Sequence, residues 1–289
     1  MGIGMNEKVA LVLLNYNDEE TTLEALSRAV AFNDIQDIIL VDNHSKEYSL
    51  LEEKQSNHIH FIRTEKNLGY AGGNNVGIEY AVKKLHANYI IIANPDVEFD
   101  NDFVQLALNV FHKYADAGVV TCKMNSKRLY SPACRLPRSA FEVALSDLPA
   151  VGPRVLAYNK NYFEHDICEV EQVWGSLLML SCAAIEATKG FDSRTFLFYE
   201  ETILGYRLKE SGFKSYLLTK HEFYHRESVS INKSILSQKK KFDFLYDSQK
   251  LFCKEYLKTS YVGLALVKLA QWMQITTFLV FWKLKGLFV

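Results

Sequence analysis

Four short apolar runs in the first third of the chain, each followed by a polar loop, constrain its fold most strongly. They cover residues 9–14, 38–41, 59–62 and 89–92. Apolar side chains recur at helical spacing after the first and third runs, which predicts helices there. Strands that alternate with helices form a parallel sheet with right-handed crossovers, so we expect an α/β fold.

The polar loops follow the carboxyl ends of the predicted strands, and these ends meet at one edge of a parallel sheet. The loops contain Asn15, Asp42, Asn67 and Asp96. In open α/β sheets this edge binds ligands. Each loop taken singly is more typical of a helix cap or a turn. Four such loops at one edge favour a nucleotide site.

Two of these loops carry groups suited to a nucleotide. Asp42 directly follows an apolar strand and could accept the imide N–H of a uracil or thymine. Gly72 and Gly73 would let backbone amides approach a ligand at a helix start. A double glycine alone is a weak phosphate signal, so a cap or a turn is the alternative at both places.

The fourth run ends at Asn94-Pro95-Asp96, because Pro95 cannot donate to a sheet ladder. The Asp96 carboxylate is therefore expected at the carboxyl end of a strand. A hard oxygen ligand there suits Mg²⁺ or Mn²⁺ that carries a substrate phosphate. A polar turn built from Asn94 and Asp96 is the alternative.

Composition places the chain among ordinary globular proteins. It has 289 residues, 48% hydrophobic and 23% charged, which is enough for a full core. The net charge of −1, from 33 basic and 34 acidic side chains, argues against nucleic acid as the main partner. The five cysteines are odd in number and form no C-x-x-C pair, which is typical of a reducing cytosol without structural zinc. With no secretory signal evident at the start, we expect a cytoplasmic location.

The polar loops, in this order and spacing, resemble the motifs of family 2 glycosyltransferases of the rhamnosyltransferase-like branch. The donor-side motifs are residues 15–17, 41–45, 67–77 and 94–96. That family's acceptor-side strand, acidic pair and late histidine correspond to motifs at residues 174–180, 190–192, 196–208 and 224–225. The resemblance therefore extends over both halves of the chain.

The resemblance implies a GT-A (Rossmann-like) fold, with a mostly parallel sheet flanked by helices. Residues 1–230 would form the glycosyltransferase domain. Its nucleotide-sugar half would cover residues 1–123 and its acceptor half residues 124–230. Residues 231–289 would form a C-terminal helical appendage for membrane association or oligomerisation.

The resemblance assigns nucleotide-sugar binding to polar residues and glycines of the donor-side motifs. These are Asn15, Tyr16, Asn17, Asp42, Asn43, Asn67, Gly72, Gly73, Asn74, Asn94 and Asp96. The implied donor is a UDP- or dTDP-sugar, and Asp42 corresponds to the residue that holds the base.

The implied cofactor is Mn²⁺ or Mg²⁺. Asn94 and Asp96 occupy the family's D-x-D metal motif, and because Asn comes first, Asp96 is the one acidic ligand. His225 resembles the late histidine that can complete the metal shell, with an ordinary surface histidine as the alternative. A divalent ion would stabilise the negative charge that builds up as the nucleoside diphosphate departs.

Glu200 and Glu201 follow an aromatic run at a predicted helix start, where two carboxylates could simply favour the helix dipole. An inverting transferase also needs a base that takes the proton of the acceptor hydroxyl. Glu201 matches the second position of the family's Glu-Asp pair, so we assign it this role. Glu200 is the reserve candidate and could orient the acceptor or Arg207. The further acid that the family often has two positions later is replaced by Ile203.

The acceptor site is expected at Trp174, Gly175, Ser176 and Arg207. Trp174 could be a platform for a sugar face or an aromatic core residue. Residues 125–170 mix turn formers with cations and show no long period, which indicates either a loop over the active site or a solvated loop.

The end of the chain is rich in Leu, Phe and Trp. Residues 269–282 fall short of the ~20 apolar residues that span a bilayer, so we expect no membrane span. Trp272 and Trp282, with Lys283 and Lys285, resemble the anchors of a helix that lies in the membrane interface. A helix packed on the catalytic domain or on a second subunit of a homo-oligomer is the alternative.

We therefore expect a metal-dependent, inverting glycosyltransferase at the inner face of the cell membrane. It would add rhamnose or a hexose to a bacterial surface polysaccharide or its lipid-linked precursor. One alternative is a nucleotidyltransferase of the same fold, which would not need an acidic pair beside the acceptor. The other is a non-catalytic glycan-binding or assembly subunit, against which the presence of Asp96 and Glu201 argues.

Overall fold

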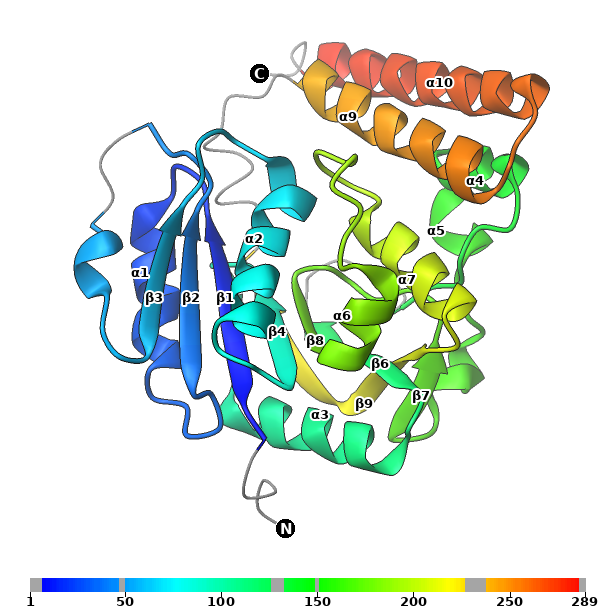
Figure 1. Ribbon diagram of the computed structural model, residues 1–289. Coiled ribbons are helices and arrows are strands. Elements are labelled where there is room, and N and C mark those ends of the chain that lie inside the picture. Colours follow the sequence, from blue (N-terminus) through cyan, green and yellow to red (C-terminus); the bar gives the residue numbers. More distant parts are fainter. Residues whose placement is uncertain (1–6, 47–49, 126–132, 149–150, 227–237, 286–289) are drawn as a thin grey trace.

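The computed structural model describes residues 7–46, 50–125, 133–148, 151–226 and 238–285. Nine strands in this part of the chain form one sheet, in the order β3-β2-β1-β4-β8-β6-β9-β5, with β7 paired to β9 (Figure 1). The strands are β1 (Val9–Asn15), β2 (Asp37–Asp42), β3 (Ile59–Arg63), β4 (Tyr89–Ala93), β5 (Val97–Glu98), β6 (Ala117–Asn125), β7 (Ile167–Val170), β8 (Leu177–Ser181) and β9 (Lys214–His225).

The first four strands coincide with the four apolar runs, and they pair with one another in parallel. The second half of the sheet is mixed, because β8 runs antiparallel between β4 and β6, whereas β6 and β9 are parallel. The expected boundary between the two halves, at residue 123, falls within β6. One continuous sheet therefore carries both the donor-side and the acceptor-side motifs.

Helices cover both faces of the sheet. They are α1 (Glu19–Ala29), α2 (Gly69–Lys83), α3 (Asn101–Lys113), α4 (Ala140–Ser146), α5 (Gly152–Val155), α6 (Cys182–Thr188) and α7 (Glu200–Glu210), with short 3₁₀ turns η1 (Glu52–Lys54) and η2 (Lys160–Phe163). Buried side chains of α1 and α3 pack on one face, and those of α2, α6 and α7 pack on the other. The result is the three-layer α/β arrangement that the alternation of strands and helices predicted.

The start of α3 shows how local sequence sets a helix boundary. Asp100 accepts a hydrogen bond from the Phe103 amide at 3.0 Å, so it satisfies one of the free N–H groups of the first turn. Phe103, Ala107 and Phe111 recur every four residues and are buried against the sheet. The Asp100 cap thus sets where α3 begins, and the apolar spacing sets which face of α3 packs on the sheet.

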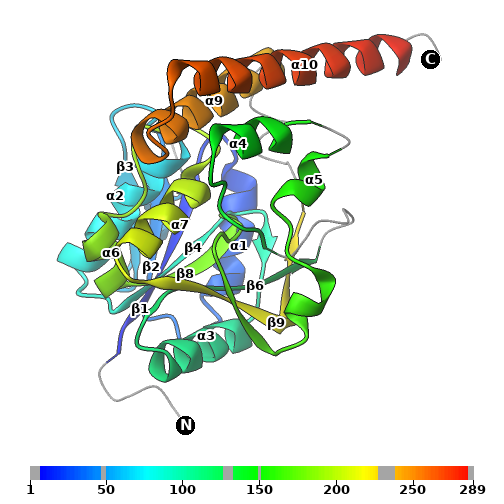
Figure 2. The ribbon, with the colours of Figure 1, turned by 90° about the vertical axis from the view of Figure 1, so that its right-hand side faces the viewer.

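The C-terminal appendage consists of α9 (Gln238–Leu251), the π-helical turn η3 (Phe252–Tyr256) and α10 (Tyr261–Lys285). Helices α9 and α10 lie side by side and pack over α4, at one end of the sheet (Figures 1 and 2). A separate apolar core joins Val143 of α4, Ile203 of α7, Phe252 and Val267. The appendage therefore shares a core with the helix that carries the acidic pair.

The outer face of α10 exposes apolar side chains, whereas its inner face is buried. Within the described ranges, no helix combines the length and apolar character needed to cross a membrane. Exposed apolar side chains nevertheless line this face, including Tyr261, Leu269 and Trp272, of which Trp272 is 63% exposed. The side chains of Trp282, Lys283 and Lys285 lie outside the described residues.

Candidate active site

The polar loops of the donor side meet at the carboxyl edge of the sheet, as expected. Strands β1 and β2 pair in parallel with Asn15 opposite Asp42, and Asn15 Nδ2 donates to Asp42 Oδ1 at 3.1 Å. Asn43 Nδ2 donates to Asn67 Oδ1 at 3.1 Å and to the Gly69 carbonyl at 3.0 Å. The predicted residues of three loops therefore form one connected group.

Asp42 is fully buried and held by several groups. Its Oδ1 accepts from the amide and the hydroxyl of Ser45, and its Oδ2 lies 2.8 Å from Arg63 Nη1. Ser45 Oγ also accepts from the Asn17 amide, and Asn17 itself adopts a left-handed conformation with φ of 53°. Tyr16 is half-buried beside it. The loop after β1 is thus bound to the loop after β2.

The glycine-rich motif is helical from Gly69 onward, earlier than the apolar spacing indicated. Gly72 and Gly73 lie inside α2, where a Cβ on Gly73 would come within 2.6 Å of Leu14 Cδ1. Gly69 has φ of +74°, and a Cβ there would lie 2.2 Å from the Phe196 carbonyl oxygen. Small residues at these positions allow α2 to pack closely on β1 and on the acceptor side.

Asn94 and Asp96 form a polar turn and also meet His225. The Asn94 carbonyl accepts from Val97 N at 3.0 Å, and the Asn94 amide donates to the Ser176 carbonyl at 2.8 Å. Strand β5 pairs antiparallel with β9, with Val97 opposite His225. This pairing places His225 Nε2 at 3.3 Å from Asp96 Oδ1.

The Asp96–His225 pair fits a hard divalent cation. Two neighbouring ligands of an octahedral ion with bonds of about 2.1 Å lie about 3.0 Å apart, close to the observed separation. No group of three or more metal-ligating side chains occurs among the residues that the structure describes. A cation held by this pair would therefore complete its shell with water and substrate phosphate oxygens, as Mg²⁺ usually does.

Glu200 and Glu201 begin α7 after two consecutive left-handed residues, Phe198 and Tyr199, with φ of 73° and 69°. Glu201 is half-buried and its Oε1 accepts from the Gly175 amide at 3.1 Å. Glu200 is only 2% exposed. Burial raises the pKa of both carboxyls, and the neighbouring Glu201 raises the pKa of Glu200 further.

Gly175 is matched closely to Glu201. A Cβ at Gly175 would lie 2.1 Å from Glu201 Oε1, so any other residue would displace the carboxylate. Trp174 beside it is half-buried, and Ser176 is buried. Gly175 therefore borders the carboxylate assigned as the base, and Trp174 and Ser176 flank it in the sequence.

Tyr70 connects the donor side with the acceptor side, although the sequence alone did not single it out. Its hydroxyl donates to the Gly175 carbonyl at 2.5 Å. The pKa of Tyr70 is raised, first by burial and then by the carboxylates of Glu201, Glu200 and Asp96. The charges of these three carboxylates therefore act on one phenol.

Several buried polar atoms at this site have no hydrogen-bond partner among the described residues. They are Asn74 Oδ1, Ser176 Oγ and Glu200 Oε1. A buried polar atom without a partner costs about 1–3 kcal/mol, so such atoms usually mark a place where a ligand or water binds. All three belong to residues that the sequence assigned to the site.

Arg63 was also missed by the sequence analysis, although the pairing register reveals it. Strands β2 and β3 pair with Asp42 opposite Arg63. A cation one position after an apolar run, opposite an aspartate that ends the neighbouring run, is the signal that could have found it. Sequence spacing shows this relation only once the register of the two strands is known.

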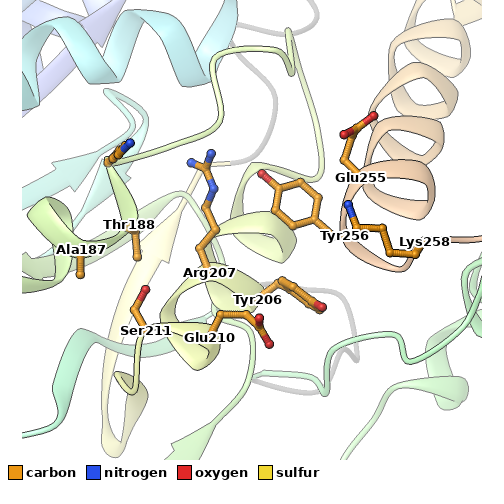
Figure 3. Close-up of a pocket in the computed structure, with 10 residues that line it drawn as sticks. Ala187, Thr188, Tyr206, Arg207, Glu210, Ser211, Glu255, Tyr256 and Lys258 are labelled. Atoms are coloured by element: carbon orange, nitrogen blue, oxygen red, sulfur yellow. The ribbon is translucent and has the colours of Figure 1, made fainter.

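Arg207 lies away from the other predicted acceptor residues, about two helical turns along α7 from Glu200. Its guanidinium donates to the Gly190 carbonyl at 3.2 Å and lies 3.7 Å from Asp192 Oδ2. It lines a cavity of about 390 Å³ between α6, α7 and η3, where its guanidinium lies 5.9 Å from the centroid of the Tyr256 ring (Figure 3). The structure thus does not bring Arg207 together with Trp174, Gly175 and Ser176.

The sheet and its helical layers define a GT-A glycosyltransferase fold. A solved structure, "Crystal structure of GalNAc-T7 with UDP, GalNAc and Mn2+", has a TM-score of 0.61 to this chain at 11% sequence identity. The similarity covers 76% of this chain and 44% of that one. At this identity, the likeness concerns the fold.

Sequence comparison supports the same family that the motifs resemble. Residues 11–132 match Glycosyl transferase family 2. The Low-salt glycan biosynthesis hexosyltransferase Agl10 of Haloferax volcanii is 23% identical over 273 residues, 93% of this chain and 84% of that protein. An N-acetylglucosaminyl-diphospho-decaprenol L-rhamnosyltransferase of Mycobacterium tuberculosis is 25% identical over 206 residues, 67% of each chain. The family match and the two named relatives support an enzyme of glycosyltransferase family 2 that is similar to rhamnosyltransferases.

Proposed function

We propose that this enzyme transfers rhamnose or a hexose from a dTDP- or UDP-sugar, with inversion, to a bacterial surface polysaccharide or a lipid-linked oligosaccharide. One observation carries the proposal. The Asn94-Pro95-Asp96 turn, where Asp96 pairs with His225, donates from the Asn94 amide to the Ser176 carbonyl, and the preceding residue, Gly175, donates to Glu201. A site for the donor diphosphate and a site for acceptor deprotonation are therefore adjacent, as direct displacement at an anomeric carbon requires.

On the donor side, the carboxyl edge of the sheet would bind the nucleotide. Asp42 would hold the base and Asn15, Asn43 and Asn67 would support its loop, since these groups are already connected by hydrogen bonds. Asp96 and His225 would hold Mn²⁺ or Mg²⁺. Such an ion, when bound, supplies positive charge at the diphosphate leaving group.

On the acceptor side, Glu201 would take the proton of the attacking hydroxyl. The Gly175 amide fixes one of its oxygens, and its partial exposure leaves access for an acceptor. Burial raises the pKa of Glu201, so its carboxylate binds a proton more tightly than an ordinary glutamate does. This makes Glu201 a stronger base. Glu200, more deeply buried, would orient the acceptor.

The names of the relatives suggest the kind of acceptor. The mycobacterial protein is named for a diphospho-decaprenol acceptor and a rhamnosyl group. The haloarchaeal protein is named as a hexosyltransferase of glycan biosynthesis. Both sugars therefore belong in the first set of donors to be tested, and a lipid-linked glycan in the first set of acceptors.

A lipid-linked acceptor would require contact with the membrane surface, and we assign this contact to the outer face of α10. Residues 238–285 contain nine lysines and three acidic residues, a net charge of +6 in a chain whose total is −1. Exposed Leu269 and Trp272 in a segment of net positive charge suit an anionic lipid surface. The enzyme would then act at the inner face of the cell membrane. A homo-oligomer interface is the competing use of this face.

The proposal is tested with a panel of UDP-, dTDP- and GDP-sugars in Mn²⁺. We expect saturable binding of at least one UDP- or dTDP-sugar, slow release of its nucleoside diphosphate, and a product of inverted anomeric configuration by NMR. A product of retained configuration would refute direct displacement. Binding of nucleoside triphosphates with release of pyrophosphate would support the nucleotidyltransferase alternative.

A further inference from the structure

The segment that leads into α7 holds an unfavourable backbone conformation. Phe198 and Tyr199 both have positive φ, a region that bulky residues rarely adopt. Such residues persist only where surrounding contacts hold them, and they cluster at functional sites. Here they immediately precede Glu200 and Glu201, so the conformation of this turn sets the direction of both carboxylates.

Helix α9 of the appendage contacts this turn through one face. The rings of Phe196 and Phe244 stack with centroids 4.6 Å apart. Ser248 Oγ donates to the Leu197 carbonyl at 3.2 Å. Phe244 and Ser248 are four residues apart and therefore lie on the same side of the helix. Two successive residues of the turn are thus held from the C-terminal part of the chain.

The third contact involves Tyr199 itself. Tyr199 packs against the apolar core that contains Val143 and Phe252, and its ring centroid lies 5.7 Å from that of Phe252. Gln249 is almost fully buried and donates through Nε2 to Asp147 Oδ1 at 2.8 Å. The end of α4 and the end of α9 therefore enclose the tyrosine from two sides.

We propose that Phe244 and Ser248 are positioning residues of the acceptor site, which hold the left-handed turn at 198–199 and so aim Glu200 and Glu201. The inference rests on the proposed function, because it assigns these carboxylates to acceptor deprotonation. On this inference, the C-terminal appendage supports the geometry of the active site. A shift of α9 would then alter turnover without any contact to the donor.

The test is the double variant Phe244→Leu with Ser248→Ala, assayed with the donor found active for the wild-type enzyme. We expect kcat to fall about 10-fold to 100-fold, because small displacements of a catalytic group cost that much, while the KM for the donor changes less than about twofold. Burial is the main cause of the raised pKa of Glu201. Loosening the turn should therefore also shift the acidic limb of the kcat–pH profile to lower pH.

Two controls separate positioning from general stability. Val267→Ala removes a buried side chain of α10 and leaves both contacts of α9 with residues 196 and 197 in place, so it should lower Tm while kcat falls much less than in the double variant. The single variant Phe244→Tyr keeps both the aromatic ring and Ser248, so it should retain a kcat close to that of the wild-type enzyme. A double variant with wild-type kcat, or a Val267→Ala variant with an equal loss of kcat, would overturn the inference. Absence of transfer by the wild-type enzyme with every nucleotide sugar would instead overturn the proposed function on which it rests.

Discussion

Glu200 and Glu201 are adjacent in the sequence but have different surroundings. Glu201 retains access to solvent and a fixed hydrogen bond from Gly175, whereas Glu200 has a buried Oε1 without a partner among the described residues. Asp192 shows how hydrogen-bond donors change the pKa of a carboxyl that is also buried. Burial opposes its ionisation too, but hydrogen bonds from Arg194 and Tyr256 outweigh that effect and lower its pKa to about 2. Neighbouring groups, more than burial alone, therefore decide which carboxyls in this region stay ionised.

The assignment of the base predicts an order of effects. Glu201→Gln keeps the size of the side chain but removes its basicity, so kcat should fall by about 10² or more with little change in donor affinity. Glu200→Gln should reduce kcat less. Steady-state kinetics on both variants, with donor binding measured separately, checks the order. The reverse order would assign the base to Glu200.

Which site residues can be found from sequence depends on how they are brought together. Asp96 and Asp42 end apolar runs, so their common edge follows from strand topology. His225 was named from resemblance, and only the pairing of β5 with β9 explains its contact with Asp96. The contact of Tyr70 with Gly175 joins residues 105 positions apart through packing of α2 on the acceptor side, and no local pattern reports it.

Elements were predictable where a long apolar pattern exists and unpredictable elsewhere. The buried strands β1, β2 and β4 have continuous apolar runs, and the half-buried β3 is apolar apart from His60 and Arg63, which is why the sequence located them. The region after β6 contains the short elements α4, α5 and β7, which are too brief to show a period. Their positions depend on tertiary contacts, including the burial of Asp147 at the end of α4 against Gln249 of α9.

This contact between α4 and α9 predicts a pH effect on stability. Burial raises the pKa of Asp147 to about 6, despite the hydrogen bond from Gln249. The folded state then binds more protons than the unfolded state between about pH 4 and pH 6, so Asp147 lowers the free energy of unfolding as pH rises through that window. Asp147→Asn keeps a side-chain oxygen that can accept the hydrogen bond from Gln249, and it cannot ionise, so it avoids this loss of stability. We expect the variant to gain on the order of 2 kcal/mol at pH 8 and little at pH 4.

Thermal unfolding of both proteins across this pH range measures the difference. Other titrating groups are common to the two chains and cancel in the comparison. A difference that does not vary between pH 4 and pH 8 would show that Asp147 has an ordinary pKa. A variant that is less stable at every pH would show that the charged form is needed.

At the scale of the whole molecule, charge and apolar surface are concentrated in the C-terminal layer. Val267 and Ala270 of α10 are buried in the core shared with Ile203 of α7, whereas Leu269 and Trp272 are exposed on the opposite side. Deleting α10 would therefore uncover the core beneath the acidic pair. Substitutions on the exposed side are the sharper test of membrane contact.

We predict that Leu269→Ser with Trp272→Ser weakens binding to anionic vesicles at least about tenfold, because two large apolar side chains no longer enter the interface. Tm should change little, since neither side chain belongs to the buried core. Vesicle co-sedimentation with and without anionic lipid measures the effect. Failure of the wild-type protein to bind, together with a change from dimer to monomer in the variant, would identify this face as a subunit interface.

The central claim is that Asp96 supports metal-dependent release of a nucleoside diphosphate from a sugar donor. The most direct measurement is the rate of this release in Mn²⁺ for the wild-type enzyme, the Asp96→Asn variant and the wild-type enzyme after exhaustive chelation. We predict that the variant and the chelated enzyme both lose release almost completely, that Mn²⁺ restores only the wild-type enzyme, and that donor binding in Mn²⁺ weakens in the variant. Full activity in the Asp96→Asn variant, or undiminished wild-type activity after chelation, would contradict the account.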